Sequence, residues 1–143
     1  MMHLVLFLAA SACPVLTTPT VGGVLGEVEI SLTEINKPVG YVCKFAGAGH
    51  DLDVTVAALD RGEFPVFEKS ACDGGRVETL RAVGNEAVAC SFQSKSGIIE
   101  KVVGRVRNRA FSVVLSSTDG GLDEKAARSK VAMLAEQVAG NLF

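Results

Sequence analysis

The chain has 143 residues, of which 48% are hydrophobic and 21% charged, and its formal net charge at pH 7 is -2. This length and composition fit one compact domain that buries a core of its own. The small negative charge argues against a general nucleic-acid-binding protein, which normally carries a clear excess of Lys and Arg. The sequence contains no dinucleotide fingerprint and no phosphate-binding loop, so we expect no cofactor.

The first twelve residues are typical of a secretory signal peptide. An apolar run from Leu4 to Ala10 leads into Ala10-Ser11-Ala12, a small-residue site for signal peptidase. We therefore expect a signal peptide at residues 1–12 and a single domain at residues 13–143. No Lys or Arg precedes the apolar run, so a buried N-terminal strand is the alternative. The run is too short to span a membrane.

Cys13 follows Ala-Ser-Ala directly, which resembles the lipid-attachment box of bacterial lipoproteins, although Ala10 stands where those proteins usually have Leu. The even number of cysteines argues against lipidation, because lipidating Cys13 would leave one thiol without a partner. We expect membrane attachment only if Cys13 is lipidated.

A short helix is predicted next, with Thr18 as its cap, Pro19 in its first turn and Gly26 at its end. Alternation of apolar and polar residues then predicts strands at residues 28–33, 41–45, 51–59, 77–83, 88–93, 98–106 and 110–116. The clearest alternation lies at residues 51–56, and the strand before it should turn Cys43 toward a core.

Two further helices are predicted. Residues 60–75 fit one or two helical turns that cover a core edge with Phe64, Phe67 and Ala71. A long helix from about residue 122 to 142 keeps an apolar face at the 3.6-residue period. The predicted fold is therefore α+β, an antiparallel sheet of five to seven strands flanked by a short N-terminal and a long C-terminal helix.

Several short motifs along the chain form one pattern. They are Cys13 with Leu16-Thr17 and Leu25-Gly26, then Cys43-Lys44-Phe45, Val83-Gly84-Asn85-Glu86-Ala87 and a Leu134-Ala135 helix. From Cys13 to the C-terminus the chain resembles small exported and lipoprotein domains of unknown function from bacteria, which have a PsbP-like fold. This resemblance implies an antiparallel sheet flanked by helices and a bond between Cys13 and Cys43. It implies no catalytic residues.

The cysteines Cys13, Cys43, Cys72 and Cys90 indicate disulfides rather than a metal site, because no C-x-x-C occurs and the spacings do not match zinc ligands. Of the three possible pairings, Cys13 with Cys43 and Cys72 with Cys90 closes the shorter loops. Free buried thiols in a cytosolic protein are the alternative. Two disulfides favour a secreted, periplasmic or cell-envelope location.

His50, Asp51 and Asp53 are the closest group of candidate metal or acid–base residues. Aspartates on the solvent face of a strand usually serve solubility, so we expect no metal and no catalytic residue. No second imidazole follows the signal peptide, and no nucleophile motif occurs. A small secreted hydrolase that uses carboxylates between Asp51 and Asp60 is the alternative.

Four basic residues, Lys101, Arg105, Arg107 and Arg109, recur at alternate positions around a predicted hairpin tip. Alternation predicts that they lie broadly on one side, where they can attract an unknown protein or an anionic envelope component. The alternative is an ordinary solvated hairpin whose charges prevent edge-to-edge aggregation. The predicted function is an exported, non-catalytic binding or accessory protein of the cell envelope or secretome. A secreted inhibitor or immunity protein is a further alternative.

Overall fold

The computed structural model describes residues 12–94, 97–117 and 122–143. The strands are β1 (Ser31–Lys37), β2 (Gly40–Ala46), β3 (His50–Ala58), β4 (Arg76–Leu80), β5 (Glu86–Ser94), β6 (Gly97–Val106) and β7 (Arg109–Ser117). The helices are α1 (Thr18–Leu25), a 3-10 turn η1 (Arg61–Glu63), α2 (Phe64–Cys72) and α3 (Glu124–Leu142). The predicted signal peptide lies outside the described residues, apart from Ala12.

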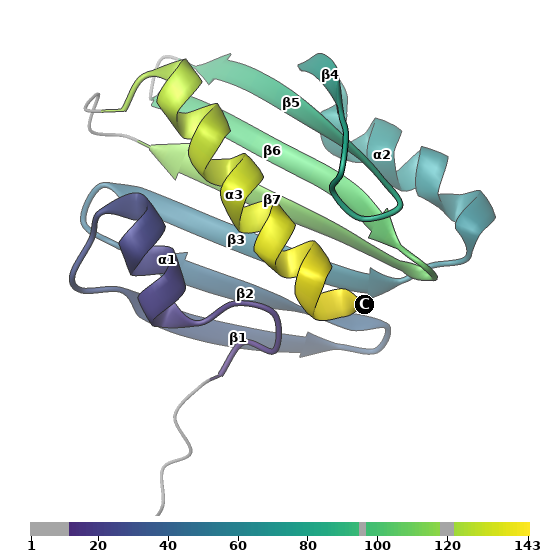
Figure 1. The fold of residues 1–143 in the computed structure, drawn as a ribbon, viewed down its shortest axis with the longest axis horizontal. Helices are drawn as coiled ribbons and strands as arrows, with labels where there is room; N and C mark the ends of the chain where they lie inside the picture. The colour runs from purple at the N-terminus through teal and green to yellow at the C-terminus, as the bar shows by residue number, and fades with distance from the viewer. Residues whose placement is uncertain (1–11, 95–96, 118–121) are drawn as a thin grey trace, which may run out of the picture.

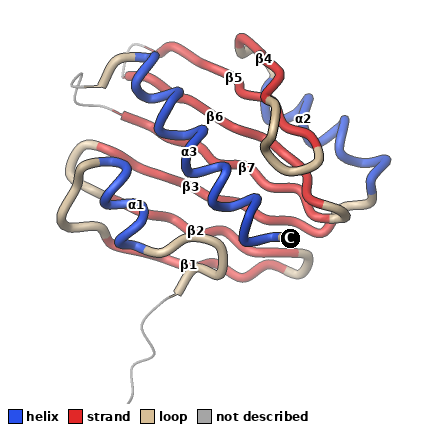
Figure 2. The backbone as a smooth tube through the Cα atoms, viewed as in Figure 1, coloured by secondary structure: helices blue, strands red, loops and turns tan. Residues whose placement is uncertain are grey.

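The strands form one antiparallel sheet of seven, in the order β1-β2-β3-β7-β6-β5-β4. Helices α1 and α3 lie on one face of this sheet and α2 lies on the other (Figures 1 and 2). Successive side chains of a strand point to opposite faces, so the neighbours Val102 and Val103 belong to two different buried clusters. The predicted α+β fold, with its short N-terminal and long C-terminal helix, is confirmed.

The larger core lies beneath α3. Helix α3 begins after Asp123, whose carboxylate accepts a hydrogen bond of 2.7 Å from the backbone N–H of Ala126. Its buried residues follow the predicted period: Ala127, Val131, Leu134, Ala135, Val138, Ala139 and Leu142. They pack on β6 and β7, where Phe111, Val113 and Leu115 are buried as predicted.

Both disulfides join a helical segment to the sheet. The bond between Cys13 and Cys43 ties the segment before α1 to β2, and the bond between Cys72 and Cys90 ties the last residue of α2 to β5. This is the pairing of sequence neighbours favoured above. Cys43 and Cys90 are fully buried, each on the face of the sheet that its helix covers.

Some predicted boundaries needed correction. The N-cap of α1 is Thr17 rather than Thr18, because the Thr17 hydroxyl accepts the hydrogen bond from Thr20 N–H. Strand β1 begins at Ser31, three residues later than predicted, and Val28 is fully exposed. Strand β4 ends at Leu80, because the chain turns at Ala82, where φ is 64°.

Glu27 explains the late start of β1. Its carboxylate accepts hydrogen bonds from the backbone N–H groups of Ala48 and Gly49, each at 3.1 Å, and contacts Nδ1 of His50 at 2.6 Å. Residue 27 is thereby held against the β2–β3 turn rather than in the sheet. Burial alone would raise the pKa of Glu27, but the His50 and backbone hydrogen bonds outweigh it and lower the pKa.

Candidate functional site

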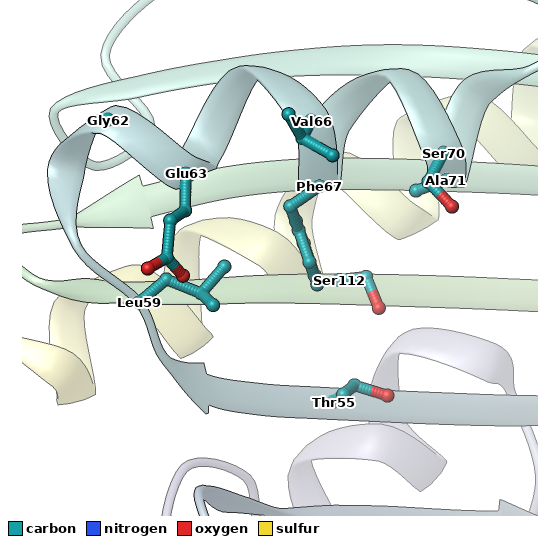
Figure 3. Close-up of a pocket in the computed structure, with 9 residues that line it drawn as sticks. All are labelled: Thr55, Leu59, Gly62, Glu63, Val66, Phe67, Ser70, Ala71 and Ser112. Atoms are coloured by element: carbon teal, nitrogen blue, oxygen red, sulfur yellow. The ribbon is translucent and has the colours of Figure 1, made fainter.

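A groove of about 600 Å³ lies between α2 and the sheet (Figure 3). Most of its lining surface is apolar, and its residues come from α2, the preceding turn and two strands: Thr55, Leu59, Gly62, Glu63, Val66, Phe67, Ser70, Ala71 and Ser112. A concave, mostly apolar site with a few polar groups is the usual form of a small-ligand site. This groove is therefore the candidate functional site.

The groove exists because α2 covers only half of its face of the sheet. Phe64, Phe67 and Ala71 of α2 pack over Val103 and Ala110 of β6 and β7. Strand β3 lies next to β7 in the sheet, beyond the reach of this packing. The flank of α2 thus forms one wall of the groove, and the uncovered strands form its floor.

Strand register sets the groove floor. Thr55 of β3 pairs with Ser112 of β7, and Figure 3 shows both side chains on the sheet surface below α2. On the other side, Thr55 pairs with Val42, which pairs with Ile35 on the edge strand β1. Residues paired in this way share a face, so the floor continues from Thr55 to the sheet edge for about 10 Å, at about 4.8 Å per strand.

The groove offers few polar groups. Thr55, Ser70 and Ser112 each bring a hydroxyl, and Glu63 brings the one charged side chain among the lining residues that the structure describes. None of these four side chains has a hydrogen bond or an ion pair with another residue that the structure describes. These groups are thus available to a ligand.

The structure splits the basic residues that were expected on one side of the β6–β7 hairpin. Lys101 and Arg105 lie on the α2 face, whereas Arg109 pairs with Val106 and so shares the α3 face. The reason is the hairpin turn, which occupies Arg107 and Asn108 only and therefore places odd-numbered residues of β6 and β7 on opposite faces. The predicted shared side is therefore found for Lys101 and Arg105, but the prediction was wrong for Arg109.

Two of these basic side chains are also engaged within the molecule. The Lys101 ammonium donates to the carbonyl of Ala71 in the last turn of α2 at 3.1 Å and lies 4.9 Å from the centroid of the Phe92 ring. Arg105 is 9% exposed and pairs with Glu86 at 3.3 Å. Arg107 and Arg109 remain exposed at the hairpin tip.

The carboxylates considered for hydrolysis are dispersed. Asp53 lies on β3 opposite Lys44, and Asp60 follows the strand seven residues later, about 23 Å away at 3.3 Å per residue. Burial raises the pKa of Asp53, the Lys44 charge opposes that rise, and the Asp51 charge adds to it. His50 is held by Glu27. No group of three metal-ligating side chains occurs in residues 12–94, 97–117 and 122–143.

The structure adds one polar cluster that the sequence did not reveal. Glu100 of β6 is completely buried under the start of α3, where its Oε2 accepts a hydrogen bond of 2.6 Å from Ser91. The Arg128 guanidinium lies 3.9 Å from the same oxygen. Burial raises the pKa of Glu100, while the Ser91 hydrogen bond and the Arg128 charge oppose the rise. The only signal in the sequence was that Glu100 is the one acid of a strand whose other charged residues, Lys101 and Arg105, are basic.

The fold and the groove define a disulfide-bonded α+β domain with an apolar site on one face of its sheet. Comparison with known protein families, curated proteins and solved structures finds no match to this chain. Within the described ranges, no helix is long and apolar enough to cross a membrane.

Proposed function

We propose that this protein is an exported, non-catalytic binding protein of the cell envelope or secretome, and that the groove beside α2 is its ligand site. The observation that carries the proposal is the groove of about 600 Å³ with its mostly apolar lining. Sites for small organic molecules typically have volumes of about 300 to 1,000 Å³ and apolar walls. The expected ligand is a small, largely apolar molecule.

The chemistry of the lining supports binding rather than catalysis. Ser70 and Ser112 carry hydroxyls, but a hydroxyl is a weak nucleophile unless a base activates it. Glu63 is the one titratable residue among the described lining residues, and Figure 3 shows it at the far end of the groove from Ser70. Ser70 therefore has no carboxylate of this lining beside it to act as its base.

Export is supported by the cysteines. The two disulfides indicate that the protein folds in an oxidising compartment, because thiols in the cytosol of most organisms are kept reduced. The apolar run and the Ala10-Ser11-Ala12 site agree with this location, as does the resemblance to exported PsbP-like domains. The sulfur of Cys13 is bonded to Cys43, which favours a form without a lipid anchor.

We expect the exported protein to begin at Cys13 and to contain two disulfides and no lipid. Intact-mass measurement on the protein recovered from the producing cell, with and without reduction and alkylation, checks these points together. A mass that retains residues 1–12 would contradict cleavage, and four thiols alkylated without reduction would contradict the disulfides. An added acyl mass on Cys13 would contradict the form without an anchor.

Replacing Val66 with Asn should weaken binding of the neutral apolar dye Nile red by about three- to tenfold, since each buried methyl group contributes up to about 0.8 kcal/mol. Val66 lines the groove but is 72% exposed without ligand, so the change should leave stability nearly unaltered. Fluorescence titration measures the affinity. The matched control is Val77→Asn on β4, which is 53% exposed and lies outside the groove. Equal affinity of the two variants would contradict a site beside α2.

A further inference from the structure

The described lining of the groove carries a negative charge, that of Glu63. The Glu63 carboxylate extends from the start of α2 toward the end of β3, where Leu59 lies (Figure 3). It has no ion-pair partner within the part of the chain that the structure describes. The other lining residues whose side chains the structure describes are apolar or carry hydroxyls, so Glu63 is the charged group among them.

Two further acids lie on the groove face of β3, on the side of Thr55 away from Glu63. Asp53 and Asp51 precede Thr55 at steps of two residues, so they lie on the same face, about 7 and 13 Å from it. Lys44, which pairs with Asp53, is the base that faces them from β2. The next base across the sheet, Lys101, is directed to the carbonyl of Ala71 at 3.1 Å.

We infer that the groove selects apolar ligands that carry a positively charged group, such as an alkylammonium, over neutral and anionic ligands of equal length. The inference rests on the proposed function, because the apolar wall must first bind the chain of the ligand. Glu63 then attracts the charged end of the ligand. A carboxylate on the same chain meets repulsion from Glu63.

The experiment compares three probes that share an eight-carbon chain: octylammonium, 1-octanol and octanoate. Each is titrated below its aggregation concentration into the full domain containing Nile red, and displacement of the dye gives its affinity. Octylammonium should bind about two- to fivefold more tightly than 1-octanol, because an exposed charge pair contributes modestly. Octanoate should bind least, and added salt should narrow these differences.

Glu63→Gln should abolish the preference for octylammonium over 1-octanol, measured as the ratio of the two affinities within the same variant. The matched control is Glu68→Gln, which changes an acid on the same helix outside the groove and should retain the preference. Equal binding of the three probes, or an unchanged preference in Glu63→Gln, overturns the charge selection while the proposed function stands. If neither Nile red nor any probe binds, both proposals fail.

Discussion

Replacing Leu134 with Asp in α3 is expected to lower the free energy of unfolding by about 4 kcal/mol or more, because an unpaired charge would enter an apolar core. Leu134 is 0% exposed and packs with the buried residues of β6 and β7. Val138, also 0% exposed and one turn further along α3, should behave in the same way.

The matched control is Met133→Asp, which places the same charge at the neighbouring position on the outer side of α3. Met133 is 52% exposed. Its unfolding free energy should stay within about 0.5 kcal/mol of wild type, as is usual for surface changes. Urea denaturation followed by circular dichroism compares the variants. A melting temperature for Leu134→Asp within a few degrees of wild type would show that this face of α3 is not packed on the sheet.

Removal of the Cys72–Cys90 bond should also have a large effect on stability. The two cysteines are 18 positions apart, and in the chain-entropy model a loop of this length stabilises the fold by roughly 3 kcal/mol. The double variant Cys72→Ser with Cys90→Ser leaves no odd thiol. It should also weaken Nile red binding, because the bond anchors the C-terminal end of α2, which is a wall of the groove.

The other disulfide provides the comparison. Cys13 and Cys43 are 30 positions apart, so replacing both with Ser should cost a similar roughly 3 to 4 kcal/mol. That bond lies on the α1 side of the sheet, so dye binding to the folded fraction should be unchanged. Urea midpoints and dye titrations measure both effects. Equal loss of dye affinity in the two double variants would show that α2 is not anchored in the way described.

The elements that the sequence predicted well are those whose periodicity is set by a single buried face. Leu52, Val54 and Val56 alternate with polar residues because β3 has α1 and α3 on one side and little cover on the other. The apolar residues of α3 keep a helical period because one side of the helix packs on the sheet. These patterns are local, so they can be recognised in a sequence.

The groove could not be predicted, because it depends on which half of the sheet α2 covers. Thr55 and Ser112 are far apart in the sequence and meet only through the pairing of β3 with β7. The prediction that all the basic hairpin residues lie on one face of the sheet was wrong for Arg109 for a related reason. Alternation determines which residues of one strand share a face of the sheet. The length of the turn decides whether Arg109, on the next strand, lies on the same face as Arg105 or on the same face as Val106.

The central claim, that the groove beside α2 is the ligand site, is tested most directly by a titration of the ¹⁵N-labelled protein with 1-octanol, followed by amide chemical shifts. The largest shift changes should occur at Thr55, Leu59, Phe67 and Ser112, which line the groove from three different parts of the chain. Amides of α1 and of the outer side of α3 should change little. Shift changes centred on the α3 face, or no saturable change up to the solubility limit of 1-octanol, would contradict the claim.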